Sequence, residues 1–159
     1  MREAIGGAYI FQIVVFFILL FTGFMSLSIN YSRAFNVSTE IANIIERNNG
    51  FSTRAQGEIS QYLVDVGYRT KGNCNSNEDV DYDGYDLSAE SLIASGDSNK
   101  KSTICLKTVK LRESDSKEFP ETAYYRVKVF FKLDLPIMSS LFEFEIRNST
   151  RQLYFPIDS

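Results

Sequence analysis

The apolar positions near the start of the chain form one long, almost unbroken run from residue 8 to residue 27. No charged residue lies between Glu3 and Arg33. A helix rises about 1.5 Å per residue, so this run spans roughly 30 Å, the thickness of the hydrocarbon core of a bilayer. The pattern predicts a membrane-spanning helix. Its non-apolar interruptions are Gln12, Thr22, Gly23 and Ser26.

A signal peptide and a soluble core helix both fit this apolar run less well than a membrane span. A cleaved secretory signal peptide has a shorter apolar run that ends in small residues, whereas here the run continues to Leu27 and residues 30–32 make a poor cleavage site. A soluble core helix that is apolar on all sides needs a larger protein around it. The charges of Arg2 and Glu3 nearly cancel before the apolar run, and residues 34–50 after it are also poor in Lys and Arg. We place the C-terminal domain outside the cytoplasmic membrane.

Beyond Arg33 the apolar positions fall on one face only. Residues 36–48 carry apolar side chains at i, i+4, i+7 and i+8, so they predict an amphipathic extension of the first helix that ends at residues 48–50. The apolar residues are Val37, Ile41, Ile44 and Ile45. A second helix is expected to start at a capping box of Thr53 and Gln56 and to end at Gly67. Its core face is Ala55, Ile59, Tyr62, Leu63 and Val66.

The last third of the chain has the period-two pattern of strands. Residues 103–112, 125–135, 142–147 and 150–155 predict an antiparallel meander, and the alternation in 125–135 predicts one buried and one solvated face. Residues 68–102, rich in Asn, Asp, Ser and Gly, predict a long loop. The fold class is therefore α+β: a long N-terminal helix, a second helix and a small antiparallel sheet of three or four strands. We divide the chain into a leader (1–7), a membrane-spanning helix (8–33) and an extracytoplasmic domain (34–159).

Composition narrows the range of functions. With 159 residues the chain can hold one domain and an anchor. A formal net charge of -3, without a long basic cluster, argues against a nucleic-acid-binding surface. The chain has no His, which removes the commonest general base, and no nucleophile or phosphate-binding motif stands out. We therefore do not expect an enzyme.

An acidic segment in the predicted loop has the spacing of a calcium-binding loop. Residues 79–90 fit the pattern D-x-D-x-D-G-x5-E, which places oxygen ligands at positions 1, 3, 5, 7 and 12. Calcium is therefore a candidate cofactor, bound weakly as in extracellular modules. The alternative is a solvated acidic loop whose Asp and Gly residues favour turns. The candidate ligands are Asp79, Asp81, Asp83, the Tyr85 carbonyl and Glu90.

The chain has two cysteines, Cys74 and Cys105. In an exported domain they would most simply form one disulfide, and in the cytosol two reduced thiols. A disulfide would enclose the acidic segment in a ring of about thirty residues and remove roughly 3–4 kcal/mol of unfolded-state entropy. Two buried free thiols remain the alternative.

The N-terminus resembles that of type IV pilins and pseudopilins. A charged leader that ends in Gly6 and Gly7 is followed at once by an apolar helix that continues into an amphipathic one. The resemblance implies cleavage by a prepilin-type peptidase between Gly7 and Ala8. Gln12 then occupies the fifth mature position, where typical pilins carry a glutamate, and this departure favours the tight-adherence (TadE-like) branch.

The C-terminus has a second, similar resemblance. A strand of the form aromatic-x-V-x-V is followed by LDLPIMSSLFEFEI and NSTRQLYF, an order of strands that looks like the end of TadE-like proteins. The two resemblances cover both ends of the chain and leave residues 50–120 unmatched.

Together these resemblances imply a structural subunit, a major or minor pilin or pseudopilin, of a bacterial cell-surface filament. Its partners would be the membrane, other copies or related subunits, and the pilus assembly machinery. The N-terminal helices would form the filament core. The alternative is a monomeric, membrane-anchored extracellular protein that binds calcium or another ligand. The residues expected to pack in the filament core are Gln12, Phe17, Phe21, Gly23 and Phe24.

Overall fold

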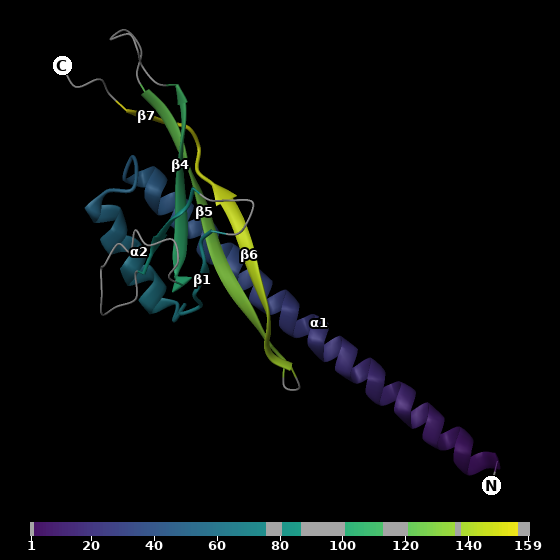
Figure 1. Ribbon diagram of the computed structural model, residues 1–159. Helices are drawn as coiled ribbons and strands as arrows, with labels where there is room; N and C mark the ends of the chain where they lie inside the picture. The colour runs from purple at the N-terminus through teal and green to yellow at the C-terminus, as the bar shows by residue number, and fades with distance from the viewer. Residues whose placement is uncertain (1, 76–80, 87–100, 113–120, 136–137, 156–159) are drawn as a thin grey trace.

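The computed structural model describes residues 2–75, 81–86, 101–112, 121–135 and 138–155. Helix α1 (Arg2–Arg47) runs without a break from the N-terminal region into the domain, where α2 (Thr53–Asp65) follows it. Figure 1 shows the N-terminal half of α1 projecting away from the domain. The prediction of an α+β fold with a long apolar helix, a second helix and an antiparallel sheet is confirmed.

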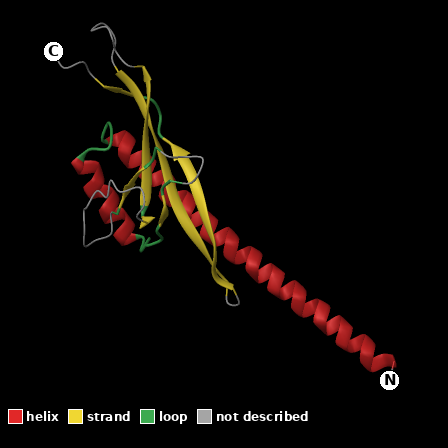
Figure 2. Cartoon of the chain, in the orientation of Figure 1, coloured by secondary structure: helices red, strands yellow, loops and turns green. Residues whose placement is uncertain are grey.

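Among the described residues the sheet has five strands, and every pairing between them is antiparallel. Figure 2 shows these strands together. Its order is β2 (Asp83–Tyr85), β4 (Ile104–Arg112), β5 (Glu121–Leu135) and β6 (Met138–Ser149). A separate pair consists of β1 (Gly72–Asn73) and β3 (Lys101–Ser102). The predicted meander is therefore correct for β4, β5 and β6, while three short strands lie in the segment that the sequence predicts as a loop.

The last strand, β7 (Leu153–Phe155), does not extend the meander but pairs with β5. It occupies the part of β5 that β6 leaves uncovered, because β6 pairs from Arg126 onward and β7 pairs at 121–123. Thr150 joins the two segments. Its backbone N–H donates to the Tyr125 carbonyl at 2.9 Å, and its hydroxyl accepts from the Tyr125 N–H at 2.9 Å. The great length of β5 thus allows β6 and β7 to share one edge.

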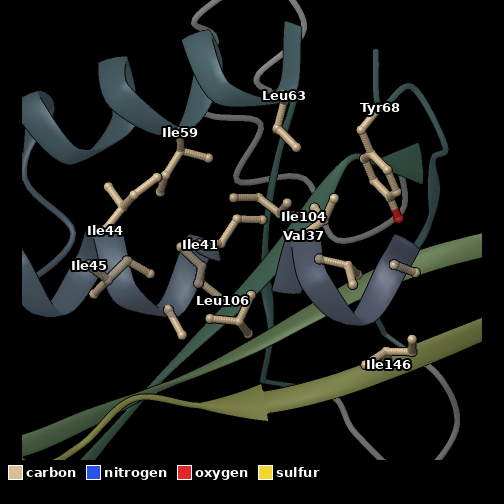
Figure 3. Close-up of a cluster of buried hydrophobic side chains, with 14 of the residues drawn as sticks. Val37, Ile41, Ile44, Ile45, Ile59, Leu63, Tyr68, Ile104, Leu106 and Ile146 are labelled. Carbon is tan, nitrogen blue, oxygen red and sulfur yellow. The ribbon is translucent and has the colours of Figure 1, made fainter. Parts of the chain in front are cut away.

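The main core lies between the helices and one face of the sheet (Figure 3). The C-terminal half of α1 contributes the predicted stripe, in which Val37, Ile41 and Ile45 are fully buried. From α2, Ile59 and Leu63 point toward this stripe. The sheet closes the core from the other side with Ile104, Leu106, Val127, Val129, Phe131 and Ile146.

Hydrogen bonds define where α1 ends and where α2 begins. After α1, Asn49 takes a positive φ of 51° and the Gly50 N–H donates to the Ile45 carbonyl at 2.9 Å, so residues 48–50 end the helix as predicted. The start of α2 differs by one residue from the prediction. Ser52, not Thr53, is the N-cap, and its hydroxyl accepts from the Ala55 N–H at 3.3 Å.

The outer face of the sheet is not simply solvated, contrary to the expectation from its alternating pattern. Lys128 and Phe130, which point away from the helices, are almost completely buried. Residues 72–75, the covering segment, and the Tyr82 ring lie over them and form a second, smaller core. Its members are Cys74, Tyr82, Cys105 and Phe130.

Gly84 leaves room for this second core. A Cβ atom built on Gly84 would collide with Ser102 Oγ and lie 3.0 Å from Cys74 Sγ. We expect Gly84→Ala to lower the free energy of unfolding by about 1–3 kcal/mol, the usual cost of overpacking. Urea unfolding of the full chain in detergent measures this effect.

Gly57→Ala is the matched control. Gly57 lies in α2 with no atom within 4 Å of an added Cβ, so alanine is expected to stabilise the helix by about 0.5–1 kcal/mol. Equal unfolding midpoints for the Gly84 variant and the unchanged chain would show that the segment over the sheet is loosely packed.

Candidate functional site

The N-terminal half of α1 is the largest apolar surface that the described residues leave uncovered. The helix is long and apolar enough to cross a membrane, and none of its most apolar window is buried within the chain. The expected packing residues Phe17, Phe21 and Phe24 are each about two-thirds exposed, at 65%, 64% and 67%. A surface of this kind needs lipid or other helices around it.

The expected packing residues fall on two opposite faces of α1. At about 100° per residue, Gln12 and Gly23 point in nearly the same direction, whereas the three phenylalanines point roughly the opposite way. The face of Gly23 continues along the helix to Ala34 and Ile41, which the sheet buries. The five residues expected to pack in the filament core therefore lie on two faces of α1, a small-residue face and an aromatic face.

Polar side chains in the span bond to their own helix. The Thr22 hydroxyl donates to the Ile18 carbonyl at 2.8 Å, and the Asn30 amide donates to the Ser26 carbonyl at 3.0 Å. Such bonds let polar residues enter an apolar environment without an external partner. Gly7 and Ala8, the expected cleavage position, both lie within α1.

A disulfide joins Cys74 to Cys105, with 5.4 Å between their Cα atoms, as expected for an exported domain. Cys105 lies on β4 opposite Gly84 of β2, so the disulfide fixes the covering segment to the sheet beneath it. Both cysteines are fully buried. The separation of 31 residues corresponds to roughly 3–4 kcal/mol in the loop-closure model.

Lys128 is fully buried beside this disulfide. Its ammonium group donates to the Cys74 carbonyl at 3.1 Å and lies 3.3 Å from a Glu145 carboxylate oxygen. It also lies 4.3 Å from the centre of the Tyr82 ring. A carbonyl, a carboxylate and an aromatic face together compensate the loss of water around the charge. Lys128 therefore holds the covering segment from below.

The structure places part of the acidic segment in the sheet. Asp83 and the Tyr85 carbonyl belong to β2, and Asp81 lies just before it with a carboxylate 3.0 Å from Lys107 Nζ. Burial and, secondarily, the Asp83 carboxylate raise the pKa of the Tyr85 phenol. The other two expected ligands, Asp79 and Glu90, lie outside the described residues. Within the described ranges, no group of three or more His, Cys, Asp or Glu side chains is placed to hold a metal.

A pocket of about 550 Å³, which the sequence does not predict, lies where α1 enters the domain. Its cations come from α1, the segment after α2, β3 and β5, and no basic run in the sequence announces them. Tyr68 forms part of the wall; its hydroxyl donates to the Phe130 carbonyl, and burial raises the pKa of its phenol, which stays neutral. The cations that line the pocket are Arg33, Arg69, Lys71, Lys101 and Lys132.

Comparison with protein-family models, with curated proteins and with solved structures finds no match to this chain. Its function is therefore proposed below from its own surfaces.

Calcium binding by residues 79–90 stays a prediction and is tested by calorimetric titration of the full chain. We expect a saturable heat with a dissociation constant of roughly 10⁻⁴–10⁻³ M, as for extracellular calcium modules, and its loss in Asp79→Ala. Asp65→Ala, at the exposed end of α2, is the control and should bind as the unchanged chain does. Identical heats for Asp79→Ala and the unchanged chain would eliminate this loop as a calcium site.

Proposed function

We propose that this chain is a structural subunit of a pilus-like bacterial filament, held in the membrane by α1 before it assembles. The observation that carries the proposal is the N-terminal half of α1, a continuous, exposed and apolar rod outside its own domain. In the membrane, lipid surrounds this rod. In the filament, the helices of neighbouring subunits surround it and form an apolar core.

The two faces of α1 support an open assembly. When a subunit contacts its neighbours through two different surfaces and the rotation between subunits does not close a ring, a helical filament results. Gly23 is only partly exposed, on the face that the sheet buries further along α1, and its small size leaves room there for another backbone. The opposite face presents three large exposed rings, those of Phe17, Phe21 and Phe24. One helix thus offers unlike contacts on its two sides.

The connection between α1 and the domain also suits a filament subunit. The same helix that carries the apolar rod supplies Val37, Ile41 and Ile45 to the core, so the domain follows the orientation of the helix. Helices packed in a regular array would therefore carry their domains outward in a matching array. The disulfide suits the position of such domains outside the cell.

Assembly of such helices gains little from the hydrophobic effect, because lipid tails are as apolar as the helix surface. Close packing, small residues and the work of the assembly machinery must then drive it. We expect Gly23→Leu to impair filament formation strongly while leaving membrane insertion intact, because leucine is more apolar but blocks close approach. Negative-stain microscopy and membrane fractionation of cells that overproduce the protein measure the two effects.

Gly57→Leu provides the matched control, since Gly57 lies on α2 with open space around it. It should form filaments as the unchanged chain does. Normal filaments from Gly23→Leu would count against this packing face. The absence of fibres from the unchanged chain would favour the monomeric, membrane-anchored accessory protein, for which the acidic segment beside the disulfide is the supporting feature.

Processing of the leader gives a further prediction. In the proposed subunit the mature chain begins at Ala8, so intact-mass analysis of the protein from assembled filaments should show the loss of residues 1–7. Gly7→Leu should abolish this loss, because it alters the residue at the cleavage position, and filaments should disappear with it. Filaments whose subunits still begin at Met1 would contradict cleavage at this position.

A further inference from the structure

Lys128 lies beside both cysteines of the disulfide, but it meets each of them in a different way. It is the cross-strand partner of Cys105, because the register of β4 and β5 sets these two residues directly opposite each other. Side chains in such positions point to the same face of a sheet, with their Cβ atoms about 4.5–5.5 Å apart. The Lys128 ammonium group also donates to the Cys74 carbonyl at 3.1 Å. Lys128 thus connects the strand that carries one cysteine with the segment that carries the other.

The two cysteines reach this place by different routes. β4 and β5 follow each other in the chain and pair as antiparallel neighbours, so Cys105 faces Lys128 as soon as these strands pair. Cys74 comes from the covering segment, which precedes the whole sheet in the chain. Formation of the disulfide therefore requires that the covering segment settles on the sheet at the right position.

Backbone contacts hold the two ends of the covering segment. Its pairing with the rest of the chain joins β1 to β3 over two residues. The Gly72 backbone lies close against the Phe130 ring, and the Asn75 side-chain oxygen accepts a hydrogen bond from the Tyr82 N–H at 3.3 Å. Between these ends, the bond from Lys128 acts on Cys74 itself and carries a full charge.

A bond to the Cys74 carbonyl also restricts the Cys74 sulfur, since both belong to one residue. Hydrogen bonds from a charged donor are roughly twice as strong as neutral ones. Lys128 is fully buried, so little water competes for its ammonium group. With Cys74 held in this way, its Cα lies 5.4 Å from that of Cys105, within the range that a disulfide needs.

We propose that Lys128 is a positioning residue for the oxidation of Cys74 and Cys105. In the reduced chain its ammonium group binds the Cys74 carbonyl and sets the two thiols side by side, and the disulfide then makes this arrangement permanent. The buried charge acts first and the covalent bond second. This order concerns the domain alone, so it applies equally to a filament subunit and to a monomeric anchored protein.

The oxidation itself needs an external disulfide, for which glutathione disulfide serves as the probe. One cysteine thiolate attacks it, forms a mixed disulfide and releases one glutathione thiolate. The other cysteine thiolate then attacks the protein sulfur of the mixed disulfide and releases the second glutathione. The two cysteines lose two protons and two electrons, and the two glutathione thiols gain them. Lys128 takes part in neither transfer and contributes position only.

The effective concentration of the two thiols, measured against glutathione, tests the proposal. The full chain in a neutral detergent is equilibrated with mixtures of reduced and oxidised glutathione, alkylated and analysed by intact mass. Lys128→Met keeps a long side chain without the charge. A hydrogen bond to a charged group changes an equilibrium at least tenfold, so the covering segment should be mostly detached in the reduced variant. We expect the effective concentration to fall threefold or more.

Two control variants separate this role from a loss of charge or of stability. Lys110→Met removes the same charge from an exposed position on β4 and should leave the effective concentration unchanged. Ile41→Ala removes a fully buried side chain from the main core and lowers the urea midpoint. It too should leave the effective concentration unchanged while the domain is folded, because it does not touch the second core. An equal fall in either control, or no fall in Lys128→Met, would overturn the proposal.

Acetylation of the unchanged chain gives a second test, which decides the matter if Lys128→Met does not fold. The chain is reduced with a dithiol and treated briefly with an acetylating reagent, and the modified lysines are counted by peptide mass spectrometry. Lys128 should react at least threefold more slowly than the exposed Lys110, and the two should react alike once urea unfolds the domain. Equal reaction of Lys128 and Lys110 in the folded, reduced chain would show that Lys128 does not hold Cys74 before the disulfide forms, and would overturn the proposal.

Discussion

One helix must satisfy two different surroundings, and the rest of the structure depends on how it does so. Along its N-terminal half α1 is apolar on every side, which suits lipid or other helices but not water. Along its C-terminal half only one face is apolar, and the sheet buries that face through Val37, Ile41 and Ile45. Because both halves belong to a single unbroken helix, the depth of α1 in a membrane would fix the height of the domain above it.

The second, smaller core lies on the other face of the sheet. There the disulfide, the Tyr82 ring and Lys128 attach a largely polar segment to strands that would otherwise be exposed. A lysine in this position is costly unless its charge is compensated, and the Cys74 carbonyl and Glu145 provide that compensation. The covering segment is thus attached through a covalent bond and a buried charge rather than through a large apolar area.

The sequence was most informative where a single period governs the side chains. The stripe of α1 and the strands β4, β5 and β6 follow from spacings of 3.6 and 2, and the disulfide is what two cysteines predict on condition that the domain is exported. The sequence was less informative where contacts with other segments of the chain decide the position of a residue. Ser52 and Thr53 are both capable caps, and in the structure Ser52 is the N-cap. The alternating pattern of β5 predicts that Lys128 is solvated, whereas the covering segment buries it. The pocket cations come from four segments that only the fold brings together. Calcium binding stays a prediction, because two of its five expected ligands lie outside the described residues.

The alignment of β5 with α1 has a mechanical consequence. The contacts of Thr39 with Asn148 and of Tyr31 with Phe131 show that about four residues of strand accompany about eight residues of helix, so the two axes run nearly side by side. A pull along α1 would therefore load the hydrogen bonds between β4, β5 and β6 in shear, many at once, instead of opening them one after another. The domain would thus resist unfolding under a force that acts along its own helix.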